Sequence, residues 1–297
     1  MKKLLFLYNT HAGKGLLKNR LAAVQDALAA AGWDVTIHPT QGAGDATAVA
    51  AARAGEFDRI VCSGGDGTLH EVVAGLMGLE NRPEVGYIPA GTTNDFAKNL
   101  SLPRGMEAMA RVAAAGVPRP VDIGSFNDRY FIYVAAFGAF TEIAYSTPQK
   151  NKNLLGYNAY VLEVVKSLSS IKPYHIKVES EDQTIEGDYL YGMVSNTTSV
   201  GRFRNFPPGN PDLSDGLLEV TLISPVRDVK DVEELSRALL MTDPSILNSM
   251  LTTFPARKVK ITAANELLWT LDGEAGGAHR VVEIEAVHNA YTILHGK

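Results

Sequence analysis

The chain contains 297 residues, of which 45% are hydrophobic and 21% are charged, and its net charge at pH 7 is −5. This composition is typical of a globular protein with a sizeable core and excludes disorder as a description of the whole chain. The negative charge argues against general nucleic-acid binding, which relies on a basic surface. A length near 300 residues is ordinary for two domains.

The single cysteine and the lengths of the apolar runs indicate the cellular compartment in which the protein is expected. Cys62 cannot form a disulfide within the chain, which fits a reducing compartment. The basic and apolar start of the chain is too short for a signal peptide. No apolar stretch approaches the roughly 20 residues of a membrane-spanning helix. We therefore expect a cytoplasmic protein whose contact with a membrane is at most peripheral.

Predicted strands and helices alternate along the first 120 residues. Strands are predicted at 3–8, 33–38, 59–63 and 85–88, and helices at 17–31, 45–54 and 68–76, with Asp45 as a helix N-cap. Continuous apolar strands separated by helices are typical of a doubly wound α/β domain, in which ligands bind at the carboxyl ends of the strands. We therefore predict a three-layer α/β nucleotide-binding domain over residues 1–122.

After residue 121 the pattern changes to short strands separated by turns. Strands are predicted at 130–137, 174–179, 187–194, 217–223, 257–262, 266–271, 281–287 and 291–294. Only two helical windows interrupt them, at 154–171 and at about 228–240. This pattern favours a second, mainly antiparallel β domain that begins near residue 123.

A glycine-rich loop, Ser-Gly-Gly-Asp-Gly-Thr at 63–68, lies between a predicted strand and a predicted helix. Glycines permit positive φ angles and leave no Cβ in the way of a phosphate, and the N-terminus of a helix attracts anions. Asp66 would repel a bare phosphate, so its presence implies Mg²⁺ or a ligand that carries hydroxyl groups. A plain tight turn is the structural alternative.

Two further loops follow predicted strands. The segment Pro-Ala-Gly-Thr-Thr-Asn-Asp-Phe at 89–96 has small and hydroxyl-bearing residues that suit close approach to a nucleotide, while Asn94 or Asp95 could cap the helix that follows. The loop at 9–15 contains Gly-Lys-Gly but lacks the Walker A spacing. The sequence therefore does not indicate a P-loop NTPase.

Together these three loops resemble the diacylglycerol kinase catalytic superfamily and, more narrowly, the soluble bacterial diacylglycerol and lipid kinases, relatives of the sphingosine and ceramide kinases. Residues 121–124, 152–157, 211–217 and 271–274 match the family's interdomain segment, the start of its long helix, its acidic loop and its catalytic turn. NAD kinases and phosphofructokinases share the glycine signature, whereas the ordered set is specific. The resemblance implies an NAD kinase/diacylglycerol kinase-like fold. In it a β-rich, sandwich-like domain spans 123–289, and a final strand at about 290–297 returns to the first domain.

The resemblance also implies roles for individual residues. Asp272 is the expected general base, and four acidic residues are expected to hold the catalytic Mg²⁺ and its water network: Asp66, Asp95, Asp122 and Glu274. A second, structural Mg²⁺ is expected on the Asp215 carboxylate and the backbone oxygens of Asp212 and Leu217. The residues expected to line ATP are Asn9, Thr10, His11, Ala12, Gly13, Thr40, Gly64, Gly65, Asp66, Gly67, Thr68 and Thr92.

The residues alone leave some of these roles open. Phosphoryl transfer depends on positioning and charge neutralisation, which a set of carboxylates with a metal provides. Without the resemblance, however, Asp272-Gly273 is better explained as a two-residue hairpin turn. The sequence also departs from the family pattern at Thr10, where proline is common, at His70, where asparagine is usual, and at Gly201-Arg202, where a glycine pair is usual.

We expect an ATP- and Mg²⁺-dependent lipid kinase that transfers the γ-phosphate to a lipid hydroxyl, with diacylglycerol as the expected acceptor and phosphatidic acid as the product. The alternatives are an NAD kinase-type phosphotransferase and a non-catalytic lipid- or nucleotide-binding regulator. Residues 89–96 and 271–274 favour the lipid enzyme over an NAD kinase. The retained acidic residues argue against a regulator that has lost activity.

A basic stretch bears on partners. The sequence from 150 to 177 contains five lysines and only one acidic residue, Glu163. A solvated surface and core packing of the helix are the ordinary explanations. Because anionic headgroups attract Lys and Arg, we expect residues 148–172, with Arg202 and Arg204, to lie near a lipid entrance at a membrane surface. We expect no nucleic-acid partner; a homodimer is a further expectation, since relatives are often dimers.

Overall fold

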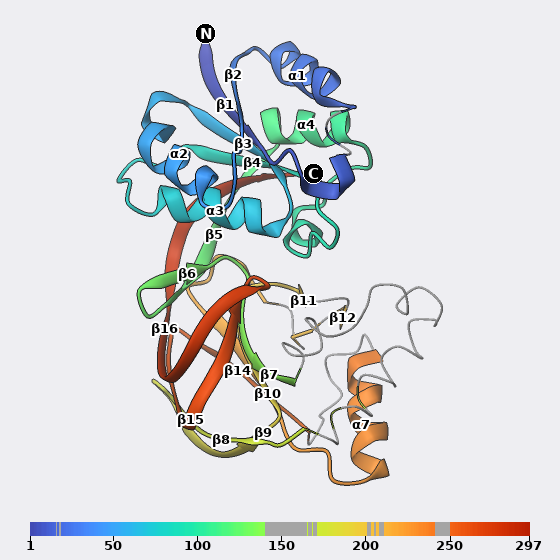
Figure 1. The fold of residues 1–297 in the computed structure, drawn as a ribbon, viewed down its shortest axis with the longest axis vertical. Coiled ribbons are helices and arrows are strands. Elements are labelled where there is room, and N and C mark those ends of the chain that lie inside the picture. Colours follow the sequence, from blue (N-terminus) through green and yellow to red (C-terminus); the bar gives the residue numbers. More distant parts are fainter. Residues whose placement is uncertain are drawn as a thin grey trace. The chain divides into compact units, whose positions relative to one another are not determined.

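The computed structural model describes residues 1–15, 17, 19–139, 165, 168, 171–200, 203–204, 206–207, 211–240 and 250–297. The chain forms two compact units (Figure 1). Unit 1 comprises Met1–Asp122 and His288–Lys297, and unit 2 comprises Ile123–Val287. Within the described part of the chain, no helix is long and apolar enough to cross a membrane.

Unit 1 is a doubly wound α/β structure, as predicted. Its parallel sheet has the order β16-β4-β3-β1-β2, in which the end of β16 joins β4 through Ile293 and Val85. Helices α1 and α4 pack together on one face and α2 and α3 on the other (Figure 1). The strands are β1 (Lys2–Tyr8), β2 (Trp33–Pro39), β3 (Arg59–Gly64) and β4 (Glu84–Pro89), and the helices are η1 (Ala12–Gly15), α1 (Leu21–Ala30), α2 (Asp45–Arg53), η2 (Ala54–Glu56), α3 (Asp66–Leu76), η3 (Phe96–Leu100) and α4 (Met106–Ala115).

Unit 2 consists mainly of antiparallel strands in the order β14-β13-β10-β7-β15-β16, with β8 and β9 attached to β15. Its elements are β6 (Arg129–Phe131), β7 (Val134–Gly138), β8 (Tyr174–Ser180), β9 (Thr184–Tyr189), β10 (Tyr191–Ser195), β11 (Ser199–Val200), β12 (Phe203–Arg204), β13 (Leu218–Ile223), α7 (Val229–Leu240), β14 (Leu251–Ala256) and β15 (Lys258–Leu271). Two long strands, β5 (Val117–Phe126) and β16 (Glu274–His295), contribute residues to both units.

The long strand β15 explains the sandwich character of unit 2. Its first part, Val259 to Ala263, pairs with β8, and its last part, Trp269 to Leu271, pairs with β7. The register with β16 shifts between Thr262 and Leu267. One apolar core is enclosed by both sets of strands, and Trp269 packs at its centre against Phe126 and Phe137, with ring centroids 5.1 and 4.8 Å away. The predicted β-rich, sandwich-like domain is confirmed.

Several element boundaries differ from the predictions. The strands predicted at 257–262 and 266–271 are one strand, because the irregularity near residues 262–267 shifts the register without ending the ladder. Those predicted at 281–287 and 291–294 are also one strand, β16, which continues through Asn289 despite its φ of 50°. The strands predicted at 187–194 and 130–137 are each divided into two. Helix α7 agrees with its prediction, whereas the helix predicted at 154–171 lies outside the described residues except at 165, 168 and 171.

Asp45 is not an N-cap, contrary to the prediction. The N-cap position of α2 is Gly44, with φ of 81°. The Glu71 carboxylate, which belongs to α3, accepts hydrogen bonds from the backbone N–H groups of Gly44 and Ala46 at 2.9 and 3.2 Å. A negative charge is favourable at a helix N-terminus. The start of α2 is therefore already stabilised by a carboxylate of its neighbouring helix.

Arg82 connects α3 with the returning strand, and its removal is expected to destabilise unit 1. Its guanidinium donates to the carbonyl oxygens of Leu76 and Met77, both at 3.1 Å, and of Ala290 at 2.5 Å. Arg82→Ala removes the guanidinium donors from these partly buried carbonyls, of which Leu76 keeps the Leu79 N–H, so we expect a loss of about 1–3 kcal/mol in the free energy of unfolding, measured in urea. Arg20→Ala, which removes only an exposed ion pair with Glu107, is the control and should cost less than about 1 kcal/mol. Equal losses in the two variants would contradict the prediction.

Candidate active site

The glycine-rich loop and the 89–96 loop are joined backbone to backbone in unit 1. They follow the neighbouring parallel strands β3 and β4, and the Ala90 N–H donates to the Gly64 carbonyl at 2.7 Å. A Cβ on Gly91 would lie 2.5 Å from the Cα of Gly65, so only glycine permits this approach. The two loops therefore form one rigid surface at the carboxyl edge of the sheet.

Asp66 fastens the two loops to each other. Its carboxylate accepts hydrogen bonds from the Asp95 N–H at 2.9 Å and the Phe96 N–H at 3.2 Å, which belong to the N-cap residue and the first residue of η3. Neither Asn94 nor Asp95 caps that helix through its side chain, contrary to the prediction. Asn94 instead has a φ of 50°, and its side-chain amide bonds both the N–H and the carbonyl of Gly91.

A buried tyrosine lies beneath these loops. The Tyr87 hydroxyl donates to the Gly64 carbonyl at 3.2 Å. Burial, and to a smaller extent the Asp66 charge, raises the pKa of Tyr87 well above its usual range. The phenol therefore keeps its proton and can act as a donor that supports the glycine loop.

The loops after β1 and β2 meet the same edge. The Asn9 N–H donates to the Ser63 carbonyl at 2.8 Å, and its side-chain amide lies 3.5 Å from the Thr68 hydroxyl. The Thr40 N–H donates to the Tyr8 carbonyl at 2.9 Å. Thr10 and Thr92 are exposed on their loops. The sheet order places the loops that carry Thr40, Asn9, Gly64 and Thr92 one after another along this edge.

Two helix N-termini in unit 1 offer different environments to an anion. The N-terminus of α2 is already bonded by Glu71. The N-terminus of α3 begins at the glycine loop and has Gly65 at its N-cap position with no side-chain cap. Because backbone N–H groups and the helix dipole attract anions, the N-terminus of α3 is better suited to an anion than that of α2.

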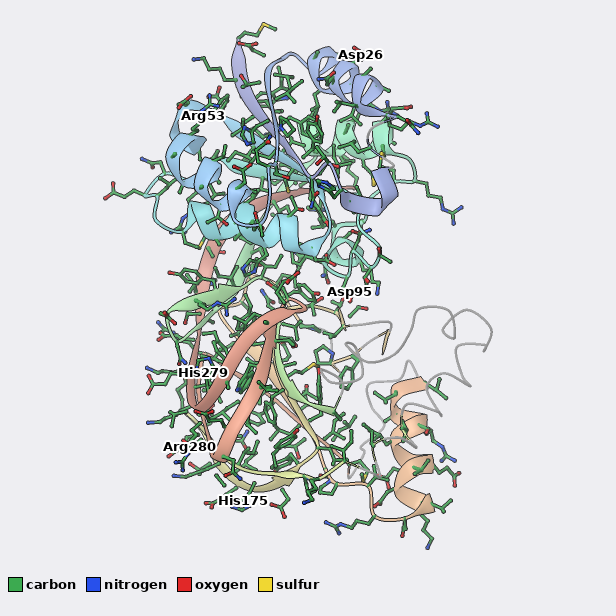
Figure 2. The ribbon with its side chains drawn as sticks, in the orientation of Figure 1. Asp26, Arg53, Asp95, His175, His279 and Arg280 are labelled. Carbon is green, nitrogen blue, oxygen red and sulfur yellow. The ribbon has the colours of Figure 1, made fainter. Side chains whose placement is uncertain are left out.

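The other two carboxylates predicted in unit 1 are buried and held by the protein. Asp95 is 4% exposed, and its Oδ1 lies 2.6 Å from Lys98 Nζ; Figure 2 labels Asp95. Asp122 is fully buried, and its Oδ1 accepts the Asn289 N–H at 2.6 Å and lies 3.0 Å from His288 Nδ1. Asp122 thus anchors the point where β16 enters unit 1.

Asp272 lies in a turn, and its carboxylate accepts hydrogen bonds from the backbone. With φ angles of 52° and 87°, Asp272 and Gly273 form the two-residue turn that joins β15 to β16. The carboxylate, on a residue only 5% exposed, accepts the backbone N–H groups of Ile132 at 2.7 Å and of Tyr133 and Val134 at 3.0 Å. The explanation as a hairpin turn is therefore correct, and it is compatible with a chemical role. Glu274 follows the turn and is exposed.

The acidic loop lies in unit 2. Asp212 Oδ1 accepts the Ser214 N–H at 3.1 Å, and Asp215 Oδ1 accepts the Leu217 N–H at 2.9 Å. Both aspartates are exposed. Just beyond the loop, burial and, second, the Asp215 charge raise the pKa of Glu219 to about 8.

The acidic residues offer Mg²⁺ oxygen ligands at separate positions. Over the described ranges, no three His, Cys, Asp or Glu side chains converge on one point. Mg²⁺ is commonly held by one or two carboxylates together with substrate phosphates and water. The buried Glu219 Oε2 has no hydrogen-bond partner, which leaves a hard oxygen donor beside Asp215. The residues therefore fit this ion.

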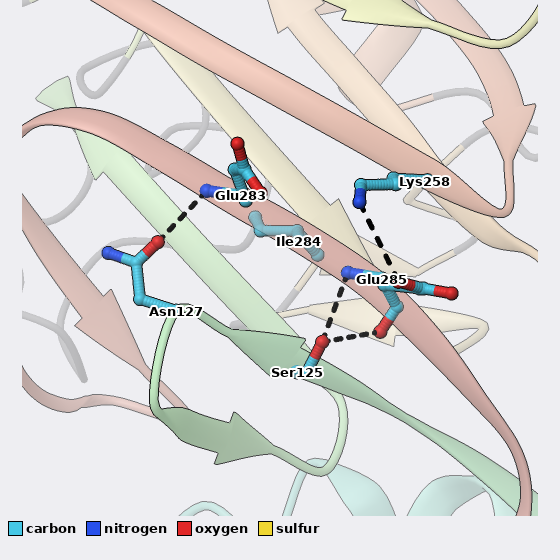
Figure 3. Close-up of a pocket in the computed structure, with 6 residues that line it drawn as sticks. All are labelled: Ser125, Asn127, Lys258, Glu283, Ile284 and Glu285. Atoms are coloured by element: carbon cyan, nitrogen blue, oxygen red, sulfur yellow. Dashed lines mark hydrogen bonds and ion pairs between the residues drawn. The ribbon is translucent and has the colours of Figure 1, made fainter.

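A pocket of about 220 Å³ in unit 2 is separate from the predicted residues (Figure 3). Ser125 Oγ bonds both the N–H and the carbonyl of Glu285, and Asn127 Oδ1 accepts the Glu283 N–H at 3.0 Å. These polar side chains hold the end of β5 and the following turn against β16. Their bonds account for the polar character of the pocket.

Comparison with known proteins identifies the family. The family model described as "Diacylglycerol kinase catalytic domain" matches residues 3–126, and the one described as "YegS C-terminal NAD kinase beta sandwich-like domain" matches residues 138–295. A diacylglycerol kinase of Bacillus subtilis (strain 168) is 37% identical over 279 residues, which is 93% of this chain and 91% of that protein. The chain belongs to the bacterial diacylglycerol kinase family.

Other similar proteins agree with this assignment. The diacylglycerol kinase of Staphylococcus aureus (strain JH9) is 32% identical over 93% of this chain and 87% of its own length. The crystal structure of a diacylglycerol kinase from Bacillus anthracis str. Sterne matches with a TM-score of 0.79 and 25% identity, covering 99% of this chain and 97% of that one. This member of the family is therefore a lipid kinase, and its family implies the use of ATP.

Some contacting residues carried no signal in the sequence. Glu71, Lys98 and Glu219 bond to or adjoin site elements, yet each is an isolated charged residue in a helix or strand pattern. Asn94 had a detectable signal, because asparagine is among the few residues that tolerate a positive φ.

Proposed function

We propose that this enzyme phosphorylates diacylglycerol with Mg²⁺ and ATP and releases phosphatidic acid. The observation that carries the choice of acceptor is that relatives 32–37% identical over 93% of the chain are named diacylglycerol kinases. The joined loops of unit 1 and the three-bond anchor of Asp272 support a phosphotransferase built from rigid parts.

In this proposal unit 1 binds the nucleotide. The phosphates lie at the N-terminus of α3, where Gly64, Gly65 and Gly67 leave no Cβ in the way. Asn9, Thr40 and Thr92 contribute from the neighbouring loops, as do Thr10, His11, Ala12, Gly13 and Thr68. Asp66 holds the second loop in place through the Asp95 and Phe96 N–H groups.

Asp272 takes the proton of the acceptor hydroxyl. As the lipid oxygen forms its bond to the γ-phosphorus, the bond from that phosphorus to the β,γ-bridging oxygen breaks and ADP leaves. The proton moves to the Asp272 carboxylate, which can accept it late in a loose transition state. Three backbone donors from residues 132–134 fix the carboxylate's orientation.

The acidic residues would hold Mg²⁺ as the resemblance implies. Asp66, Asp95, Asp122 and Glu274 belong to the catalytic ion and its water network, and Asp215, with the backbone oxygens of Asp212 and Leu217, to a structural ion. When bound, the catalytic ion neutralises charge on the phosphates.

The remaining parts of the proposal concern location and partners. The enzyme acts in the cytoplasm, where ATP is supplied, and meets its lipid at a membrane surface through the basic residues between 150 and 177 with Arg202 and Arg204. Most of these residues lie outside the described part of the chain. A homodimer is proposed from the resemblance alone, and no nucleic acid takes part.

The test is transfer of labelled γ-phosphate from ATP to lipids in mixed micelles. Diacylglycerol, monoacylglycerol, phosphatidylglycerol, a sphingoid base and ceramide are compared as acceptors, with NAD as a competitor. We expect label in diacylglycerol and a requirement for Mg²⁺. Label in another lipid would replace the proposed acceptor, and label in NAD would assign the NAD kinase activity instead. Binding of ATP without transfer to any acceptor would favour a regulator.

A further inference from the structure

Two buried polar atoms without partners lie on neighbouring strands of unit 2. Ser195 is fully buried at the end of β10, and its Oγ has no hydrogen-bond partner. Glu219 lies near the start of β13, and its shielded Oε2 has no hydrogen-bond partner either. Buried polar groups are nearly always bonded in native proteins, so each such atom requires an explanation.

The two residues face each other across the sheet. Ser195 and Glu219 are directly paired in the antiparallel register of β10 and β13. Directly paired residues project from the same face with Cβ atoms about 5 Å apart. The two unpartnered atoms therefore belong to one polar position, and a single ligand could bond both.

A second carboxylate adjoins this position. Asp215 lies four residues before Glu219, in the turn that leads into β13, and it is exposed whereas the Glu219 oxygen is shielded. Over the described residues, no Lys, Arg or His forms an ion pair with either carboxylate. Two carboxylates repel each other, and shielding one of them from water adds to the cost of its charge. A metal cation bound between them would offset both effects.

The donor set also defines the kind of cation. It consists of carboxylate and hydroxyl oxygens, which are hard ligands that suit Mg²⁺ or Ca²⁺, and it contains no imidazole or thiolate that would favour zinc. The nearby turn is preorganised, because Asp215 Oδ1 already accepts the Leu217 N–H and Gly216 has a φ of 80°.

We propose that Glu219 and Ser195 extend the acidic-loop site into the sheet: Glu219 and Asp215 bind one Mg²⁺, and the Ser195 hydroxyl bonds it on the buried side. The resemblance places only Asp215 and two backbone oxygens at this ion, so Glu219 and Ser195 are additions to that set. The site binds its ion in the absence of nucleotide and lipid, and the proposal is therefore independent of the acceptor.

The test measures binding and stability rather than activity. The full chain is stripped with EDTA, and Mg²⁺ is added without nucleotide while the thermal midpoint of unfolding is followed. Mn²⁺ serves as an electron paramagnetic resonance probe to count bound ions and measure affinity, and Ca²⁺ is tested in parallel. The variants are Glu219→Gln, Ser195→Ala and Asp215→Asn, with Glu266→Gln, an exposed glutamate of β15, as the control.

We expect one bound ion per wild-type chain and a rise of the midpoint with Mg²⁺. Glu219→Gln should weaken the ion's affinity by about tenfold or more, with a smaller loss for Ser195→Ala. In EDTA the midpoint of Glu219→Gln should be no lower than that of the wild type, because the amide keeps the shape without the charge. That result would separate loss of an ion ligand from misfolding. Glu266→Gln should behave as the wild type.

Two results would overturn the proposal. One is the same Mn²⁺ affinity in Glu219→Gln as in the wild type, which would leave Asp215 alone with the ion. The other is the absence of a bound ion in the wild type without nucleotide. A preference for Ca²⁺ over Mg²⁺ would support the site and change the assigned ion.

Discussion

Replacing Asp272 by asparagine is expected to lower the rate of lipid phosphorylation by about 10²–10⁴-fold, the usual contribution of a general base. An amide cannot take the proton of the acceptor hydroxyl. The measurement is kcat for γ-phosphate transfer from ATP to the lipid acceptor, at a temperature where the variant is fully folded. ATP affinity should be unchanged, because the loops that we propose bind the nucleotide belong to unit 1.

The structure shows that this substitution also disturbs the fold of unit 2. Both oxygens of the carboxylate accept backbone N–H groups of residues 132–134, and the asparagine NH₂ would direct donors at donors. We expect a loss of about 1–3 kcal/mol in the free energy of unfolding. Loss of activity alone therefore does not separate a base from an anchor.

Chemical rescue can make that separation. Asp272→Ala removes the carboxylate, and formate supplied in solution offers a small carboxylate in its place. Partial return of activity with formate, but not with chloride at equal ionic strength, would support proton transfer at this position. A folded Asp272→Asn enzyme with more than about a tenth of wild-type kcat would show that Asp272 is not the base, because a general base contributes at least 10²-fold.

The fold could be predicted best where long apolar strands alternate with helices, and less well elsewhere. Helix α4 was missed: its fully buried positions are the weakly apolar alanines Ala110, Ala113 and Ala114, while its larger apolar residues, Met106 and Met109, are only partly buried against the core. The alanines are required there, since even a Cβ on Gly86 of the neighbouring strand would lie 2.6 Å from the Ala113 carbonyl. Strands β5 and β14 contain prolines, which argue against a central strand; among the described strands, however, β14 lies at the edge of the sheet, beside β13.

The candidate site shows a similar division. The residue types at 63–68 and 89–96 pointed to a phosphate site because glycines and a following helix are local features. Contacts between segments were not predictable in the same way. The bonds of Asp66 to the next loop and of Asp272 to residues 132–134 join segments about 30 and 140 residues apart, and no local pattern encodes them. Each of these carboxylates has a structural role that sequence reasoning did not assign.

Gly91→Ala is expected to lower kcat/KM for ATP by about a hundredfold, the effect of displacing a binding group by about 1 Å. The added Cβ would lie 2.5 Å from Gly65 Cα and 2.8 Å from Asn94 Oδ1. Neither neighbour can move freely, because Gly65 is backbone at the start of α3 and the Asn94 amide is bonded to Gly91 on both sides. The glycine loop and the 89–96 loop must therefore separate, which displaces the N–H groups that we propose bind phosphate.

Gly78→Ala is the matched control for this prediction. Gly78 lies in the same unit, and a Cβ there would meet nothing within 4 Å. ATP affinity is measured by calorimetry and KM by the transfer assay, while urea unfolding reports the stability of each variant. The loss should fall mainly on ATP affinity, and a stabilised background should not restore it. If Gly91→Ala binds ATP as tightly as Gly78→Ala does, the joined loops are a feature of folding and the nucleotide lies elsewhere on the sheet edge.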